Sequence, residues 1–177
     1  MVFYVLEFTA ELENLTDLQP LEGCNDPNYA YYFKVKCENC GEISQKSACV
    51  TLSDLVPLPT GRGSANLVQK CKLCAREGTM QMVPGHGQPL TIEHSQAGIM
   101  SRLMVFDCRG LEPIDFSFGN GWKAQSLSGT SFEVDLSEGE FAEYDEKGEC
   151  PVGISNIQAS FRVAKKQERA GRGTTFI

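Results

Sequence analysis

Two Cys-x-x-Cys pairs constrain what this chain can fold into more than any other feature. Cys37 and Cys40 form the first pair, Cys71 and Cys74 form the second, and thirty residues lie between the pairs. A Cys-x-x-Cys turn places two thiolates on one side of a tight bend, where backbone N–H groups can point at the sulfurs. Two such turns supply four soft ligands, the tetrahedral set of a structural zinc ion. The sequence therefore predicts a Zn²⁺ site at Cys37, Cys40, Cys71 and Cys74.

Two other uses of these thiols stay open at this point. An iron–sulfur cluster would take the same four thiolates, and a redox dithiol would use one Cys-x-x-Cys pair alone. Zinc is favoured because the motif occurs twice and the intervening segment is long enough to fold back. Four protein thiolates around zinc leave no coordination position for water or substrate, so a zinc site of this kind is closed and structural.

The segment around the cysteines is basic, although the whole chain is acidic. Residues 34–76 carry seven basic and three acidic side chains, whereas the formal net charge of the chain is -7. A zinc ion with four thiolates is itself negative, and neighbouring cations stabilise thiolates. The basic excess is therefore explained by the metal site, with a nucleic-acid surface as the alternative. The acidic overall charge argues against general nucleic-acid binding.

The length of the chain indicates how large a core it can bury, and its cysteines indicate in which cellular compartment it belongs. A chain of 177 residues buries roughly 70% of its unfolded surface, so its core does not depend on zinc. Glu7 interrupts the apolar N-terminal run, which also lacks a positive flank, so we expect no signal peptide. No stretch approaches the ~20 apolar residues of a membrane span. Eight cysteines without a secretory signal suit a reducing compartment, and we expect a cytoplasmic location, or a nuclear one as well.

Apolar residues alternate with period two along most of the chain, which predicts an all-β, sandwich-like or barrel-like fold. The predicted strands span residues 1–13, 29–36, 43–52, 66–70, 78–83, 89–94, 100–108, 122–127, 131–136 and 154–163. In the second of these, Tyr31, Phe33 and Val35 share one face. Residues 14–20 and 109–116 are predicted to be turns that follow a strand, and no segment holds a helical period over three turns.

The sequence suggests that the chain contains two similar parts. Each opens with a strand that ends in a turn of leucine, proline and acidic residues, which suggests pseudo-repeat halves of about residues 1–97 and 98–163. We therefore expect residues 1–163 to form a single zinc-binding β domain, with the metal site at one end. The basic, glycine-containing segment 164–177 is predicted to be a flexible tail.

Four stretches carry a resemblance to a known family. They are residues 36–44 (KCENCGEIS), 61–77 (GRGSANLVQKCKLCARE), 108–116 (CRGLEPIDF) and 144–147 (YDEK). Together they resemble the signature of the eukaryotic CXXC motif containing zinc binding protein family, which is grouped with the uncharacterised protein families. The resemblance implies an all-β protein of two packed, similar halves, one zinc on the four cysteines, and no known enzymatic activity. The chain departs from the pattern in a slightly expanded segment 23–29 and in a longer tail.

The closed site and the lack of a catalytic constellation predict a non-enzymatic protein-interaction module. Its protein partner is not identified by the sequence, and we expect a monomer with no membrane or nucleic-acid partner. Metal handling, in which zinc is transferred or sensed, is the alternative function. A thiol oxidoreductase that uses one Cys-x-x-Cys pair is the third.

The remaining four cysteines have no short paired spacing. Cys49 and Cys108 lie in strand-like runs, which predicts buried apolar thiols. Cys24 and Cys150 lie in turn-like contexts, where a thiol could be exposed, with a regulatory thiol as the alternative.

Three further segments are weaker candidates for a function. The loop 61–66, which contains Arg62, could contact an anion or a partner through backbone N–H groups. His86 lies between two glycines, where a surface histidine is the plain interpretation and a fifth ligand or a general base is the alternative. Residues 133–149 hold eight acidic side chains and one lysine, which indicates a solvated face or a docking surface for a basic partner.

Overall fold

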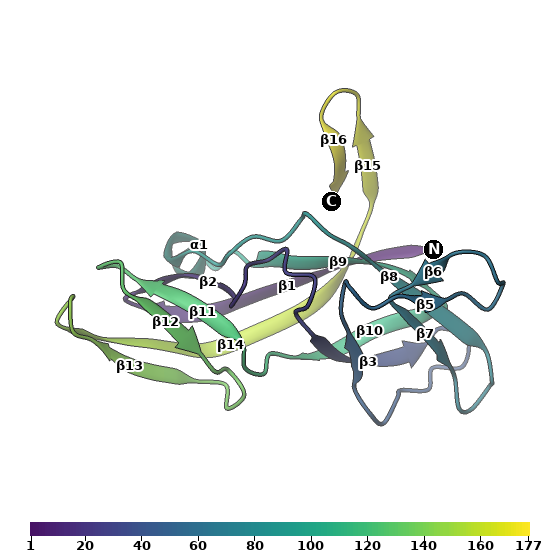
Figure 1. Cartoon of the computed structure of the whole chain (residues 1–177), viewed down its shortest axis with the longest axis horizontal. Coiled ribbons are helices and arrows are strands. Elements are labelled where there is room, and N and C mark those ends of the chain that lie inside the picture. The colour runs from purple at the N-terminus through teal and green to yellow at the C-terminus, as the bar shows by residue number, and fades with distance from the viewer.

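Antiparallel β-strands make up nearly all of the regular secondary structure in the computed structural model, which describes every residue from 1 to 177 (Figure 1). The elements are β1 (Val2–Glu13), β2 (Leu15–Pro20), β3 (Tyr31–Cys37), β4 (Ala48–Val50), β5 (Val56–Pro57), β6 (Ser64–Ala65), β7 (Leu67–Lys70), β8 (Glu77–Val83), α1 (Ile92–Gln96), β9 (Ser101–Arg109), β10 (Leu111–Ser117), β11 (Trp122–Ser126), β12 (Ser131–Val134), β13 (Phe141–Asp145), β14 (Cys150–Ala164), β15 (Lys166–Arg169) and β16 (Gly173–Phe176). The predicted all-β class is confirmed.

A six-stranded sheet in the order β13-β14-β1-β9-β8-β7 runs the length of the molecule. Two three-stranded sheets, β10-β3-β4 and β12-β11-β2, pack with it at opposite ends (Figure 1). The chain leaves the long sheet at Asn14, after β1, and at Gly110, after β9, and both residues have positive φ. β2 then pairs with β11 of the second half, and β10 pairs with β3 of the first half. This reciprocal exchange is the arrangement expected of two similar halves packed together.

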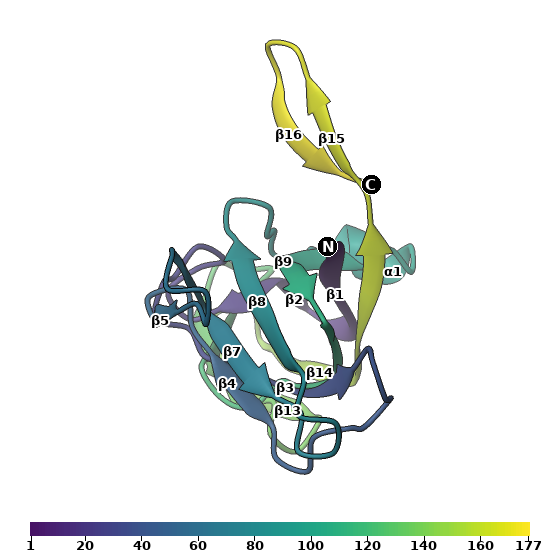
Figure 2. The same ribbon diagram turned by 90° about the vertical axis from the view of Figure 1, so that its right-hand side faces the viewer.

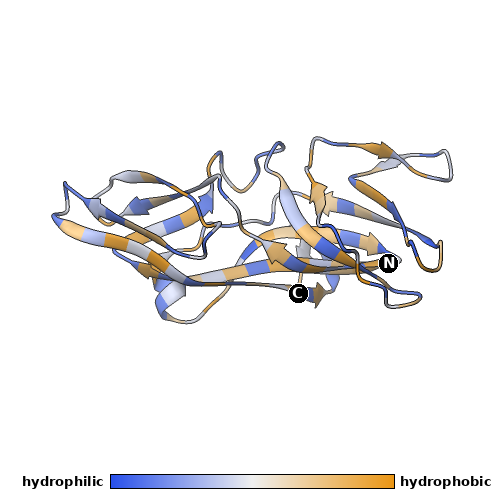
Figure 3. Ribbon diagram, turned by 90° about the horizontal axis from the view of Figure 1, so that it is seen from below, coloured by the Kyte–Doolittle hydropathy of each residue, from blue (hydrophilic) through white to orange (hydrophobic).

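The core lies between the sheets, where every second strand residue points inward. Tyr31, Phe33 and Val35 are each at most 2% exposed, which confirms the predicted inward face of β3. Phe106 stacks edge to face on both aromatic rings of that face. The alternation of apolar and polar residues along the strands is visible in Figure 3. Val35 and Leu111, which belong to this core, connect it to the end of the molecule that carries the Cys-x-x-Cys pairs.

Two segments that were predicted to be turns are strands. Residues 14–20 contain β2 and residues 109–116 contain most of β10. Pro20 and Pro113 gave the turn prediction, but both strands lie at the edge of their sheets. An edge position tolerates proline because its missing N–H would face away from the ladder.

Two predicted strands are wrong in whole or in part. Residues 89–94 were expected to be extended, but the chain enters the short helix α1 there, and the Thr91 hydroxyl caps it by accepting a hydrogen bond from the His94 N–H at 3.2 Å. Of the predicted strand 43–52, only β4 is regular, and a single isolated bridge joins Lys36 to Ile43. Both segments are short, so local capping and side-chain contacts outweigh a weak alternating pattern.

The C-terminal segment, which was predicted to be a flexible tail, forms a hairpin in the structure. β15 and β16 pair antiparallel and project from the body as a separate arm (Figure 2). Phe176 is 1% exposed and packs against Phe3, with ring centroids 5.0 Å apart, and edge-on against His86 at 4.9 Å. The basic and glycine-rich composition concealed this one apolar anchor.

A buried carboxylate fixes the end of the molecule that lies opposite the cysteines. Asp145, at the end of β13, is 1% exposed and accepts hydrogen bonds from the hydroxyls of Ser128 and Thr130. The hydrogen bond from Ser128 is the main cause that lowers the Asp145 pKa to about 2, so this carboxylate stays charged at neutral pH. The acidic run therefore includes one structural residue, and the strand β13 that carries it was missed.

Helix α1 has five residues, and no helix in the structure is long and apolar enough to cross a bilayer.

Candidate metal centre

Both cysteine pairs fold into the same turn, which we call the first knuckle (residues 37–42) and the second knuckle (residues 71–76). In the first, the Cys37 N–H donates to the Glu42 carbonyl, and a second backbone bond runs from the N–H four residues after Cys37 back to the Cys37 carbonyl, both at 2.9 Å. In the second, the Cys71 N–H donates to the Arg76 carbonyl at 2.9 Å, and the corresponding return bond measures 3.0 Å. The two turns are therefore closed by equivalent backbone hydrogen bonds.

The return bond comes from a residue in the left-handed region in each knuckle. Gly41 occupies this position in the first knuckle with φ of +80°, and Ala75 occupies it in the second with φ of +63°. Glycine adopts this conformation without steric cost, whereas a residue with a Cβ is strained in it. Gly41 therefore suits the first turn, whereas the second turn forms without a glycine.

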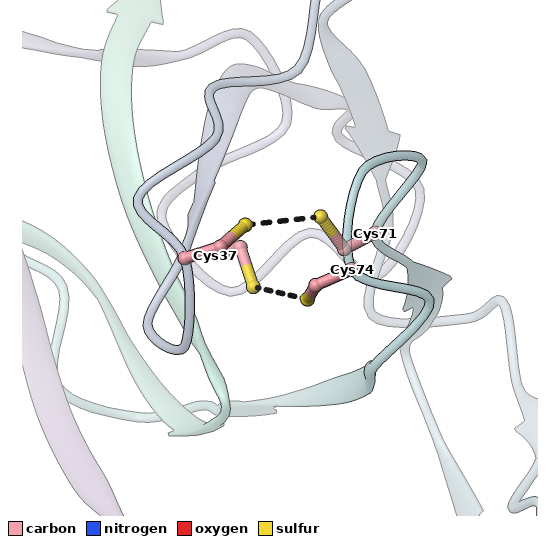
Figure 4. A group of neighbouring side chains, drawn as sticks. Cys37, Cys71 and Cys74 are labelled. Carbon is pink, nitrogen blue, oxygen red and sulfur yellow. Dashed lines mark hydrogen bonds between the residues drawn. The ribbon is translucent and has the colours of Figure 1, made fainter.

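The four thiol sulfurs converge at the tips of the two knuckles (Figure 4). The Cys37 Sγ lies 3.7 Å from the Cys74 Sγ, the Cys40 Sγ lies 3.5 Å from the Cys71 Sγ, and all four lie within 4.8 Å of one another. Four ligands at about 2.3 Å from a tetrahedral zinc ion would stand roughly 3.8 Å apart. The sulfurs are far beyond the ~2.05 Å of a disulfide bond, and all eight cysteines are free thiols. The donor set and its spacing therefore fit a single tetrahedral ion.

Backbone and side-chain donors point at the outer sulfurs. The Asn39 side chain is the largest cause that lowers the pKa of Cys74 to about 6, and the Arg76 backbone N–H is the next. At Cys40, the Glu42 backbone N–H favours the thiolate, but desolvation and the other three thiols outweigh it and raise the pKa to about 12. Four adjacent thiols cannot all ionise without a cation, and a bound metal supplies one.

The inner and outer cysteines differ in their exposure. Cys37 and Cys71 are buried, at 5% and 8% exposure, while Cys74 is half-buried and Cys40 is exposed. Cys37 ends β3 and lies opposite Leu111 of β10 in the ladder, so the sheet fixes its position. The site is therefore anchored on its inner side and reaches the surface on its outer side.

One polar contact joins the two knuckles directly. Arg76 donates from Nη1 to the Asn39 Oδ1 at 3.0 Å, and the same Asn39 side chain hydrogen-bonds to Cys74. Sequence reasoning missed Asn39 because the two inner positions of a Cys-x-x-Cys turn carry no pattern of their own. Its short amide side chain within the turn was the available signal.

The remaining cysteines were only partly predicted. Cys108 is fully buried, as expected, and burial is the main cause that raises its pKa. Cys49 is exposed, because its position in β4 points away from the core, which corrects the prediction of a buried thiol. Cys24, which its turn-like context left open to exposure, is buried at 9% exposure, and burial is the main cause that raises its pKa to about 11. Cys150 is half-buried.

The weaker candidates, Arg62 and His86, are not part of the four-thiol cluster. Arg62 lies in the exposed loop between β5 and β6, flanked by Gly61 and Gly63 with positive φ. His86 packs against Phe176, and burial together with the charge of Arg102 lowers its pKa. The group of side chains that the structure brings close enough to hold a metal ion consists of Cys37, Cys40, Cys71 and Cys74.

The fold and the cysteines define an all-β protein with a four-thiol cluster suited to a metal ion. A sequence profile of the family described as CXXC motif containing zinc binding protein, eukaryotic, matches residues 5–162. The chain belongs to this family.

Relatives match over nearly their whole length. A CXXC motif containing zinc binding protein from Xenopus laevis is 42% identical over 163 residues, which cover 91% of this chain and 98% of the relative. The Homo sapiens protein of the same name is 41% identical over 158 residues, which cover 88% and 95%. The matched profile ends at residue 162, so the hairpin β15–β16 lies beyond it.

Two solved structures share the fold. The crystal structure of C1orf123 superposes with a TM-score of 0.80 and 40% sequence identity, and the match covers 91% of this chain and 99% of that one. A hypothetical protein from Plasmodium falciparum superposes with a TM-score of 0.76 over 92% of this chain and all of its own, at 24% identity. The second match shows that the fold persists at low sequence identity.

Proposed function

We propose that this protein is a zinc-stabilised, non-enzymatic module that presents a surface to a partner protein. The observation that carries the proposal is the set of four thiols at tetrahedral spacing. Four thiolates saturate zinc, so the ion would hold the two knuckles together and would have no position left for a substrate. The family is also described by zinc binding.

A single zinc ion suits the sulfur positions better than an iron–sulfur cluster does. In a cluster the thiolates attach to more than one iron, so sulfurs on different irons stand well apart, whereas here all four sulfurs lie within 4.8 Å of one another. Elemental analysis of the purified protein should find one zinc per chain. Iron with a visible absorption band, or a metal-free protein that turns over a disulfide substrate, would overturn the proposal.

Metal handling is the second candidate, and the exposure of Cys40 is the observation that favours it. An outer thiolate in contact with solvent could pass the ion to an acceptor. A chromogenic chelator separates the two functions, because an enclosed structural ion should resist extraction while a transferable one should leave within minutes. A Cys40→Ser variant provides the control, since it removes the exposed ligand alone.

The interaction role is tested by affinity purification from cells. Wild type and a Cys37→Ser/Cys71→Ser double variant are compared, with Cys49→Ser as the control that removes an exposed thiol outside the site. We expect partner proteins to be captured by wild type and the control but lost from the double variant. Identical sets of captured proteins would contradict an interaction surface that depends on the metal.

A further inference from the structure

A groove lies beside the metal centre, between two strands that each have an unpaired edge. β4 pairs only with β3, and β7 pairs only with β8, so each ends its sheet. Figure 2 looks toward this end of the molecule, and both strands are labelled in it. A cavity of about 370 Å³ separates them, and Ala48 of β4 and Gln69 of β7 both line it. Unpaired edges of this kind are templates for an added strand.

The two ends of the groove are closed by different means. At one end Cys37 and Cys71 line the cavity, so the metal centre forms that boundary. At the other end the buried Asn66 side chain, just before β7, donates to the carbonyls of Thr51 and Asp54 at 3.3 and 3.1 Å. The spacing of the walls is therefore set by Asn66 and by whatever joins the two knuckles.

The lining combines an apolar floor with a basic rim. Val35 and Leu111 are buried at the floor, at 2% and 3% exposure. Lys46, Lys70 and Lys72 are exposed around the opening, and Glu42 is the one acidic lining residue. A lysine cluster next to an apolar floor favours a ligand that is anionic and also carries an apolar side chain.

We infer that this groove receives an extended, acidic segment of a partner protein. The segment pairs its backbone with the free edge of β7, places an apolar side chain on the floor, and presents carboxylates to the three lysines. The inference rests on the proposed interaction function and names the chemistry of its partner. Nucleic acid fits less well, because none of the lining residues is aromatic and no base could stack there.

Metal binding and partner binding are coupled in this arrangement. β7 runs directly into Cys71, and β3, which carries β4, ends at Cys37. Separation of the knuckles would release one end of both groove walls. The segment therefore binds only the metal-loaded protein, which gives the structural zinc a functional role without any chemistry at the ion.

The test uses a fluorescein-labelled peptide, Asp-Glu-Asp-Leu-Asp-Glu, and the zinc-loaded full chain, with binding measured by fluorescence anisotropy. The triple variant Lys46→Glu/Lys70→Glu/Lys72→Glu should raise the Kd by about tenfold or more, since three favourable contacts become repulsive. The matched control Lys123→Glu/Lys147→Glu/Lys165→Glu reverses three lysines outside the groove and should leave the Kd unchanged. Equal loss in both triple variants would overturn the inference, because it would show only general charge attraction.

A second pair of probes tests the strand pairing and the ligand class. A peptide of the same sequence with N-methylated backbone amides should bind at least about tenfold more weakly, because it cannot complete a ladder. Equal binding of both peptides, or tighter binding of an oligo-dT at the same lysines, would overturn the inference. If the cell-captured proteins still depend on the metal but no acidic peptide binds, the groove inference fails while the proposed interaction function stands.

Discussion

The two knuckles have the same internal geometry but are supported in different ways. The second is the tip of a hairpin in which β7 and β8 form four residue pairs. The first returns through a single bridge between Lys36 and Ile43, and its support comes from β10, where Leu111 lies opposite Cys37. The difference shows that the Cys-x-x-Cys bend shapes the turn, whereas the neighbouring strands decide where it sits and how firmly.

The largest effect should come from loss of the metal. Cys37→Ser or Cys71→Ser should each lower the free energy of unfolding by more than about 4 kcal/mol, because each removes a buried ligand and with it the ion. Because the first knuckle has fewer strand pairs than the second, we expect residues 41–47 to lose hydrogen-exchange protection first, whereas the β7–β8 hairpin keeps it. Thermal unfolding measures the loss of stability, and hydrogen exchange measures which residues lose protection.

The control for this experiment is Cys49→Ser, which changes an exposed thiol on β4 and should leave the melting temperature unchanged. Loss of protection in β8 before residues 41–47 would show that the two knuckles depend on the metal in the opposite order. Unchanged digestion of residues 37–76 by protease in either cysteine variant would show that the ion does not hold this end.

The second largest effect should come from the contact that sets the distance between the two supports. Gly78 of β8 packs on Leu111 of β10, so a Cβ there would overlap the leucine side chain and stand 3.0 Å from the Arg109 carbonyl. Gly78→Ala should therefore cost about 1–3 kcal/mol of unfolding free energy. It should also speed zinc release to a chelator, since the strands below both knuckles must shift.

Gly153→Ala is the matched control, because Gly153 is also a strand glycine and the nearest atoms to its added Cβ lie at 3.4 Å. We expect little change in stability and none in the rate of zinc release. If Gly78→Ala weakened the fold without changing zinc release, the distance between the knuckles would be fixed by the metal alone.

The cysteine cluster could be read from the sequence because its spacing carries the chemistry. Each Cys-x-x-Cys turn supplies only two of the four ligands of a tetrahedral ion, so two such turns are expected to meet, and the structure brings their sulfurs within 4.8 Å of one another. The all-β class and the inward face of β3 also followed from local patterns. These features are encoded within a few consecutive residues.

Features that depend on the position of a residue within a sheet could not be predicted in the same way. Pro113 indicates a turn until β10 is known to be an edge strand. Phe176 anchors the C-terminal hairpin through Phe3 and His86, which are distant in sequence. Asn39 has meaning only when Arg76 lies opposite it. In each case the decisive contact joins residues that are far apart in the sequence, and a local sequence pattern cannot predict such a contact.

A smaller effect should follow from exchanging the left-handed residues of the knuckles. Gly41→Ala should cost about 1 kcal/mol, because its Cβ meets no atom within 4 Å and only the positive φ opposes it. Ala75→Gly should be neutral or stabilise by at most about 0.5 kcal/mol, since relief of strain is partly offset by greater freedom in the unfolded chain. Chemical denaturation of both variants measures the pair, and equal destabilisation would show that the knuckles are not conformationally equivalent.

The smallest effect should come from Asn39→Ala, which cuts the polar link between the knuckles. It removes the acceptor of the Arg76 guanidinium and a donor to the Cys74 sulfur, but Asn39 is exposed and water replaces part of both bonds. We expect a loss of about 0.5 kcal/mol in stability and faster zinc extraction by a chelator. Arg76→Met separates the two contributions, because it breaks the bridge while leaving the Asn39 bond to sulfur. If Arg76→Met releases zinc as fast as Asn39→Ala does, the Arg76–Asn39 bridge is what slows release. If Arg76→Met releases zinc at the wild-type rate, the hydrogen bond from Asn39 to the Cys74 sulfur is what slows it.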